Sequence, residues 1–202
     1  MPRRAKTGKK LPGKLGAIVA SWGNGRPLRL MFQDEARFGR ISDTRYCGCR
    51  RPARPLVHAM VTQQYTYAYG AVSPQDGRFD RLVLPPVNSD CMQIFIDEIA
   101  SRDPDDNVVM VLDGTGWHKS QALHLPDHLR LLFLPPYSPE LNPQEHLWDE
   151  LREKHFHNRA FDSIEALEDH LVQGLRDLEN SPAQVKSITA WDWIINAVSN
   201  AN

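Results

Sequence analysis

The fold is decided by LLFLPPYSPELNPQEHLWDELREKH, residues 131–155, in which an apolar run stops at two prolines and a charged, amphipathic segment follows. The run Leu131–Leu134 has the composition of a short buried strand. Proline lacks the N–H group that a sheet ladder needs, so Pro135 and Pro136 must end this strand. We therefore predict a strand that ends at Leu134 and a turn directly after it.

A helix is predicted to follow this turn. Asn142 is a favourable N-cap residue, and Pro143 suits the first helical position because the N–H group it lacks would be unpaired there anyway. Glu145 follows three residues after the cap, where an acidic side chain is common. Tyr137 and Ser138 belong to the constrained turn that aims the helix. Glu145 is thus expected in the first turn of a helix, at a fixed distance from the end of a strand.

The chain has 202 residues, of which 41% are hydrophobic, which is enough for one domain with a substantial core and too short for two ordinary ones. Half of its 24 basic residues lie in two short windows, which contain Arg3, Arg4, Lys6, Lys9, Lys10 and Lys14, and then Arg37, Arg40, Arg45, Arg50, Arg51 and Arg54. Without these twelve and Asp43, 12 basic residues remain against 24 acidic ones. We predict a basic flexible arm over residues 1–14 and one domain over residues 15–202.

The basic windows have two interpretations. Basic clusters on an otherwise acidic protein are suited to binding a polyanion such as DNA on one side of the molecule. The candidate binding residues are then Arg37, Arg40, Arg45, Arg50 and Arg51. A disordered leader and a solvated arginine-rich loop would produce the same composition.

Cysteine content and hydropathy indicate the compartment. Cys47, Cys49 and Cys91 are few and odd in number, which argues against a disulfide scaffold and for a reducing environment. Cys47 and Cys49 are spaced too tightly for an ordinary zinc knuckle. No apolar run approaches the ~20 residues of a membrane span, and no secretion signal begins the chain. We expect a cytoplasmic protein without a membrane partner.

The rest of the chain alternates strands, helices and turns. Leu28–Gln33 is apolar enough for a strand and delivers Asp34 and Glu35 at its end. Further strands are predicted over residues 56–62, 65–72, 79–84 and 108–112, with a loop over 37–55 and a turn at 74–77. Helices are predicted over residues 89–100, from Ser120, and from a cap at Asp162 or Ser163 to Leu178. The continuously apolar 108–112 strand is expected to be central, and Asp113 follows it directly.

This order of elements predicts an α/β fold, with antiparallel strands first and parallel strands later. It is the order of a ribonuclease-H-like mixed five-stranded sheet flanked by helices. In such a sheet the ends of two neighbouring central strands and the first turn of a crossing helix can converge. Asp34, Asp113 and Glu145 are the three carboxylates so placed.

Three converging carboxylates need a positive charge to offset their repulsion, because like charges held close together raise one another's pKa. Mg²⁺ and Mn²⁺ prefer carboxylate oxygen and water, and a site of this kind leaves positions open for a substrate phosphate. Two ions roughly 4 Å apart could activate a water or a 3′-hydroxyl and stabilise the leaving oxygen of a phosphodiester. The pattern therefore predicts two-metal phosphodiester chemistry.

Each acid also has an ordinary explanation. Glu145 could serve only the helix cap or the helix dipole. Glu35 could replace Asp34 in the site, and Asp113 could simply begin a turn, since Asp-Gly is common there. Their joint placement at the ends of elements is what favours a functional interpretation.

Three motifs carry a family resemblance: FQDEARFGR at residues 32–40, VLDGTGWHKS at 111–120 and LPPYSPELNPQEHLWDEL at 134–151. They resemble the catalytic blocks of DDE-type transposases, specifically the insertion-sequence 630 family of the mariner-like superfamily. The third block is highly specific. The resemblance implies metal-dependent cleavage at transposon ends, transfer of the freed 3′-OH into target DNA, and insertion at TA dinucleotides.

The resemblance also implies roles for particular residues. Asp34, Asp113 and Glu145 correspond to the metal-binding catalytic triad, and His118 and Lys119 match the motif after the second acid, where they would position DNA. A packed surface histidine is an alternative for His118. The arginines listed above would contact double-stranded DNA.

Partners follow from the same resemblance. Family members carry helix-turn-helix domains before the catalytic domain, so we expect an upstream helix-turn-helix polypeptide and a homodimer in the synaptic complex. Two other functions stay open. The chain could be a truncated, non-catalytic remnant that binds DNA or oligomerises, or a ribonuclease-H-like nuclease with a different substrate.

Overall fold

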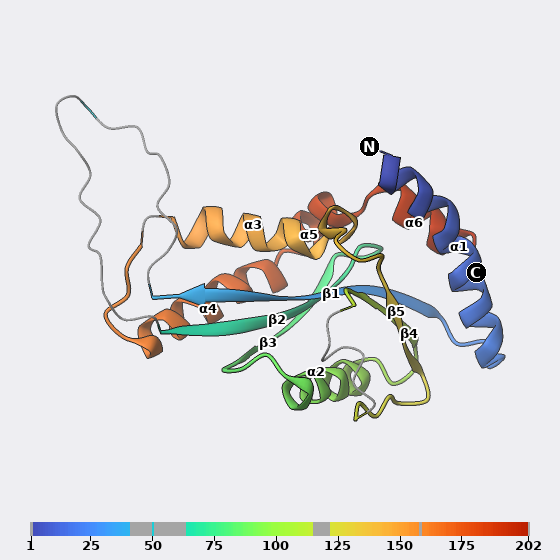
Figure 1. Ribbon diagram of the computed structural model, residues 1–202, viewed down its shortest axis with the longest axis horizontal. Helices are drawn as coiled ribbons and strands as arrows, with labels where there is room; N and C mark the ends of the chain where they lie inside the picture. Colours follow the sequence, from blue (N-terminus) through green and yellow to red (C-terminus); the bar gives the residue numbers. More distant parts are fainter. Residues whose placement is uncertain (1, 41–49, 51–63, 115–121, 158, 202) are drawn as a thin grey trace.

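The computed structural model of the protein describes residues 2–40, 50, 64–114, 122–157 and 159–201, with side chains from residue 11 onward (Figure 1). Its centre is a five-stranded sheet with the spatial order β3-β2-β1-β4-β5. The strands are β1 (Leu28–Gly39), β2 (Tyr65–Ser73), β3 (Arg78–Leu84), β4 (Asn107–Leu112) and β5 (Leu129–Phe133). The helices around it are α1 (Pro2–Trp22), α2 (Ser89–Arg102), α3 (Gln144–His155), α4 (Ile164–Glu179), α5 (Pro182–Thr189) and α6 (Asp192–Ser199).

The sheet is mixed, as predicted. The strands β1, β2 and β3 pair antiparallel, whereas β4 pairs parallel with β1 and β5 pairs parallel with β4. The central position expected for residues 108–112 is confirmed, because every residue of β4 is buried. A continuous β-branched run suits a strand that is covered on both faces.

Helices cover both faces of the sheet. Figure 1 shows α3 on one side, α2 on the other, and α1 beside α6 at the end where both chain termini lie. Helix α4 packs on the α3 side, because its buried leucines share a core with Trp148 of α3. The α3 side contains the larger core, which includes Phe32, Trp148 and Leu171. The α2 side contains a separate core around Tyr69 and Phe95. Alternation of side chains along β1 divides its residues between these two cores.

Strand β1 is longer than predicted. It continues past Gln33 to Gly39, because residues 32–39 pair with residues 65–72 of β2. Asp34 therefore lies inside a strand and not at its end. The last residue pair between β1 and the parallel strand β4 is Phe32 with Val111. Asp34 lies two residues beyond it, where β1 no longer pairs with β4.

The N-terminal segment also differs from the prediction. The structure has a helix from Pro2 to Trp22 in place of a flexible arm over residues 1–14. Leu11 and Leu15 are buried in the larger core, so the helix packs onto the domain across the expected boundary. The division of the chain at residue 14 stays a prediction.

Other boundaries agree more closely. The turn at residues 74–77 joins β2 to β3, with Gly77 at a φ of 79°. Helix α2 begins after Asn88, whose side chain accepts a hydrogen bond from the Cys91 N–H group, one residue before the expected cap. Ser163 caps α4 as predicted. The predicted strand over residues 56–62 and the helix start at Ser120 lie outside the described residues.

Candidate active site

A cavity of about 410 Å³ lies at the end of β4, where β1 and the start of α3 meet. The three candidate carboxylates all line it, although they come from separate parts of the chain: Asp34, Asp113 and Glu145. The double proline and the turn after it form much of the remaining wall, through Leu134, Pro135, Pro136, Tyr137, Ser138, Pro139 and Asn142. The predicted convergence of the three acids on one site is therefore observed.

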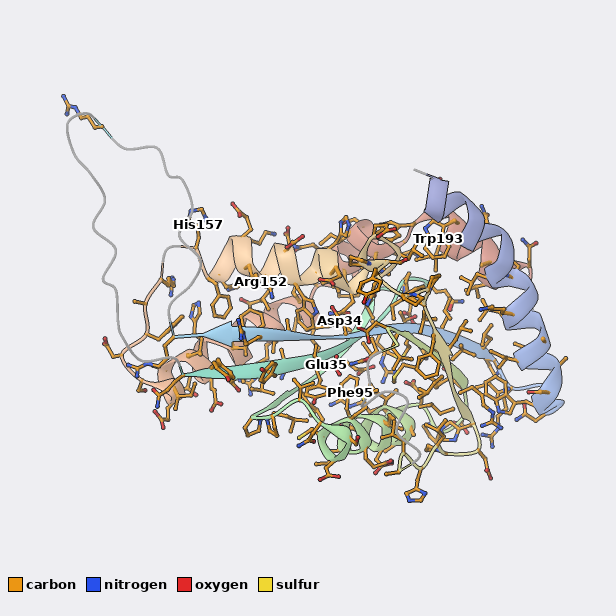
Figure 2. The ribbon with its side chains drawn as sticks, in the orientation of Figure 1. Asp34, Glu35, Phe95, Arg152, His157 and Trp193 are labelled. Carbon is orange, nitrogen blue, oxygen red and sulfur yellow. The ribbon has the colours of Figure 1, made fainter. Side chains whose placement is uncertain are left out.

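Asp34 is half-buried on the α3 side of the sheet. Its Oδ2 atom accepts a hydrogen bond from Trp148 Nε1 at 3.1 Å. Successive side chains of a strand point to opposite faces, and Figure 2 shows Glu35 on the side of α2 and Phe95. Glu35 is not among the residues that line the cavity. Of these two acids, the structure thus places Asp34 in the cavity.

Asp113 follows β4 directly and is exposed. Glu145 lies in the first turn of α3 and is half-buried. The helix begins at Gln144, one residue later than predicted, after a 3₁₀ turn over Pro139–Leu141. A helix N-terminus stabilises a carboxylate. At Glu145 burial outweighs this effect, because the pKa of its carboxyl is raised.

Asn142 connects the strand of Asp34 to the helix of Glu145. Its Nδ2 atom donates to the Gln33 carbonyl at 3.0 Å, and its Oδ1 atom accepts from the Gln144 N–H group at 3.1 Å. Asn142 is buried, so water competes little for these bonds. The predicted N-cap at Asn142 is wrong by one residue, because the helix has its N-cap at Pro143. The Asn142 side chain nevertheless ties the strand of Asp34 to the start of the helix of Glu145.

The electrostatics of the cavity indicate repulsion between its acids. Burial, with the Glu145, Glu35 and Asp113 carboxylates, raises the pKa of Asp34 well above its usual range. Partial burial also raises the pKa of Glu145, an effect that Arg152 reduces and that Asp149 and Asp113 strengthen. A cation placed in the cavity would offset this repulsion.

The donor set fits a hard divalent cation, because three carboxylates line one cavity and oxygen ligands are what Mg²⁺ and Mn²⁺ prefer. Within the described part of the chain, no group of three or more His, Cys, Asp or Glu side chains is arranged to hold one ion together. The acids thus share a cavity without forming a closed set of ligands.

The predicted DNA-binding residues fall into three groups. Arg37 and Arg50 are exposed, and the Arg37 guanidinium lies 5.2 Å from the centre of the Tyr65 ring. Arg40 is buried, and its guanidinium donates to the carbonyls of Phe161 and Asp162 and to Gln64 Oε1. This burial argues against the predicted DNA contact by Arg40 and gives it a structural role. The other four, Arg45, Arg51, His118 and Lys119, lie outside the described residues.

Sequence reasoning missed two residues that shape the cavity. Trp148 is buried and orients Asp34. Gly70 pairs with Asp34 across β1 and β2, and a Cβ atom there would lie 2.7 Å from both Gln144 Nε2 and Trp148 Cη2. The position of Trp148 three residues after Glu145 could have indicated a shared helix face. Nothing local in the sequence marks Gly70.

Residues 29–168 match the family model described as DDE superfamily endonuclease. The match spans more than half of the chain, and the protein therefore belongs to the DDE superfamily of endonucleases. A relative, the uncharacterized protein y4pE/y4sA of Sinorhizobium fredii (strain NBRC 101917 / NGR234), is 37% identical over 130 residues, which are 64% of this chain and 96% of that protein.

Solved structures of the Mos1 transposase have a similar fold. The mariner Mos1 paired-end complex with Mg matches with a TM-score of 0.60 and 18% identity, over 99% of this chain and 63% of that chain. The complex with Mn matches with a TM-score of 0.59 and 16% identity, over 96% and 62%. The chain thus spans about three fifths of the length of these Mos1 chains. At this identity the likeness concerns the fold, and it confirms the predicted ribonuclease-H-like architecture.

A membrane-spanning helix is absent from the described part of the chain, since none of its helices is both long and apolar enough.

Proposed function

We propose that this chain is the catalytic domain of a DDE-type transposase of the insertion-sequence 630 family. It cleaves phosphodiesters at transposon ends and transfers the freed 3′-OH into target DNA. The observation that carries the proposal is that Asp34, Asp113 and Glu145, from three separate elements, line one cavity. Membership of the DDE superfamily of endonucleases supports the same chemistry.

In this proposal, Asp34, Asp113 and Glu145 hold Mg²⁺ or Mn²⁺, most simply as two ions. The bound metal supplies an activated water or 3′-hydroxyl and charge stabilisation at the phosphate. The protein's own residues prepare the site: Trp148 orients the Asp34 carboxylate, and Asn142 fixes the start of the helix that carries Glu145. The solved Mos1 complexes with Mg and with Mn support the choice of ions.

The proposed partner is double-stranded DNA. Arg37 and Arg50 are exposed cations available for phosphate contacts, and His118 and Lys119 follow Asp113 closely in sequence. The target is proposed to be a TA dinucleotide. We further propose that a cytoplasmic homodimer assembles on the transposon ends, with helix-turn-helix elements on an upstream polypeptide. The Mos1 neighbours support assembly on DNA ends, because they are described as a paired-end complex with a transposon end and a strand-transfer complex.

A joining assay tests the proposal. Pre-cleaved oligonucleotide ends carrying a free 3′-OH are incubated with a supercoiled plasmid, Mg²⁺ and either the wild type or Asp113→Asn, and the junctions are sequenced. The proposal predicts joined products at TA with the wild type and none with the variant. Equal joining by both proteins would place the chemistry elsewhere. DNA binding without joining by either protein would favour a non-catalytic remnant.

A further inference from the structure

Tyr137 has a backbone conformation that tyrosine rarely adopts. Its φ is 53°, and among the described residues it is the one non-glycine position with a positive φ. An L-residue in this region is strained, and such strain persists only where the surrounding structure enforces it. Tyr137 is therefore held in place by its neighbours.

The neighbours that hold Tyr137 are mostly rigid. Pro135 and Pro136 precede it, and the Ser138 hydroxyl donates to the Pro136 carbonyl at 3.3 Å across it. The 3₁₀ turn follows at Pro139, closed by the Leu141 N–H group, which donates to the Ser138 carbonyl at 3.0 Å. The turn then joins the buried Asn142 that links the two acidic elements. The backbone of Tyr137 is thus fixed to the same frame as Asp34 and Glu145.

The Tyr137 side chain is 93% exposed, the largest exposed fraction among the large hydrophobic side chains of the described residues. It also lines the cavity that contains the three carboxylates. The exposed ring contributes little to core packing. It lies at the wall of the cavity on a fixed backbone, where a ligand that enters the cavity would meet it.

We propose that Tyr137 stacks on a nucleobase next to the scissile phosphate and so positions the DNA end in the cavity. This inference rests on the proposed function, because it takes DNA as the substrate. A phosphodiester joins two nucleosides. If the carboxylates and their cation hold this phosphate, the bases of the two nucleosides lie near the cavity wall. Every base has an aromatic face, and base–aromatic stacking tolerates any sequence.

The test uses DNA ends that carry 2-aminopurine, a fluorescent adenine analogue that is quenched by stacking, at single positions around the scissile phosphate. Binding is measured with Ca²⁺ in place of Mg²⁺. Tyr137→Phe keeps the ring, Tyr137→Leu keeps an apolar side chain without the ring, and Tyr137→Gly removes the ring and relieves the strain. Tyr65→Leu is the matched control for the quenching, since Tyr65 is exposed on β2 but does not line the cavity. It is not a control for affinity, because the Tyr65 ring lies against Arg37.

We expect the wild type, Tyr137→Phe and Tyr65→Leu to quench the probe at one position beside the scissile phosphate. Tyr137→Leu and Tyr137→Gly should lose this quenching and bind the DNA end about 5- to 150-fold more weakly. Tyr137→Gly should melt at a higher temperature than the wild type, although it binds DNA less well. A purely structural role for Tyr137 would instead lower the melting temperature of this variant.

The inference is overturned if Tyr137→Leu and Tyr137→Gly bind and quench like the wild type, or if the wild type quenches at no position. Failure of the proposed function appears differently. If the wild type quenches at one position but does not join DNA ends with Mg²⁺, the stacking contact stands and the catalytic proposal falls. If the wild type joins ends and Tyr137→Leu quenches normally, the catalytic proposal stands and the stacking contact falls.

Discussion

The indole N–H group of Trp148 donates to Oδ2 of Asp34 at 3.1 Å, across 114 positions of sequence. Trp148 lies three residues after Glu145, so both residues belong to one face of α3. The helix thus carries one acid of the cavity and orients another. Trp148 is itself fixed by edge-to-face contacts with Phe38 and Phe79.

Trp148→Phe should weaken divalent-metal binding by about 10- to 100-fold, because removing the partner that orients a ligand typically costs this much. The change removes the N–H donor and keeps most of the apolar packing. The measurement is the Mg²⁺ concentration that gives half of the maximal nicking rate, taken well below the melting temperature of the variant.

Trp193→Phe is the matched control for this change. Trp193 packs edge-to-face on Phe32, and its Nε1 atom is buried without a hydrogen-bond partner among the described residues. The same chemical change there should leave the Mg²⁺ dependence unaltered. Equal shifts in both variants would mean that the Trp148–Asp34 bond does not tune the site.

Asp34→Asn should stabilise the metal-free protein at neutral pH. The pKa of Asp34 is raised in the fold, so the folded state binds this proton more tightly than the unfolded chain. The wild type therefore loses stability as the pH rises from the unfolded value of about 3.9 toward the folded value. Asn carries no charge and avoids this loss, while its Oδ1 atom can still accept from Trp148.

Thermal melting at several pH values checks this prediction. The variant should exceed the wild type at pH 7, and the difference should shrink as the pH falls below about 4, where the carboxyl is protonated in both states. Added Mg²⁺ should raise the melting temperature of the wild type more than that of Asp34→Asn. A variant that is less stable than the wild type at pH 7 would show that repulsion does not dominate the cavity.

Gly70→Ala should lower the free energy of unfolding by roughly 1–3 kcal/mol, the usual cost of overpacking. The new methyl group would lie 2.7 Å from Trp148 and 2.9 Å from Phe79, and it would push α3 away from the sheet. Urea denaturation measures the change. Gly13→Ala is the control, since no atom lies within 4 Å of its added Cβ and alanine in a helix should add about 0.5–1 kcal/mol.

Arg29→Met should cost roughly 2–3 kcal/mol of unfolding free energy, because it leaves the buried Asp103 with fewer cations. Arg29 lies 3.2 Å from Asp103 and 2.7 Å from Asp106. The cost stays below that of a fully buried pair, since the Arg29 side chain is 19% exposed and Arg78 also contacts Asp103. Lys154→Met, which breaks an exposed pair with Glu150, should change stability by less than about 1 kcal/mol. Similar losses in the two variants would contradict this account.

Local signals predicted the elements that carry the acids. The double proline, the helix start near Asn142 and the apolar run over residues 108–112 depend on adjacent residues alone. The elements that they define could therefore be predicted, although the helix begins one residue later, with Pro143 as its N-cap. The mixed order of strands followed from the spacing of these elements. Pairing with β2 extended β1 beyond Gln33, and this long-range effect has no local signature.

Contacts between distant segments could not be predicted. Arg40 looks like one more cation of an arginine-rich window, but Phe161 and Asp162 fold back to bury it. The Trp148 bond to Asp34 likewise exists only once α3 lies on the sheet. The helical packing of Leu11 and Leu15 against the domain depends on residues far along the chain, including those of α6. In each case tertiary contacts overrode a reasonable local interpretation.

In the proposed function, Asp34, Asp113 and Glu145 act together with a divalent metal on phosphodiesters. The most direct test is the initial nicking rate of a labelled DNA end, measured against Mg²⁺ concentration for the wild type, Asp113→Asn and Asp169→Asn. Asp169 is exposed on α4 and does not line the cavity. We predict a saturable Mg²⁺ dependence for the wild type and Asp169→Asn, and a loss of about 100-fold for Asp113→Asn. Equal rates for the wild type and Asp113→Asn would contradict it.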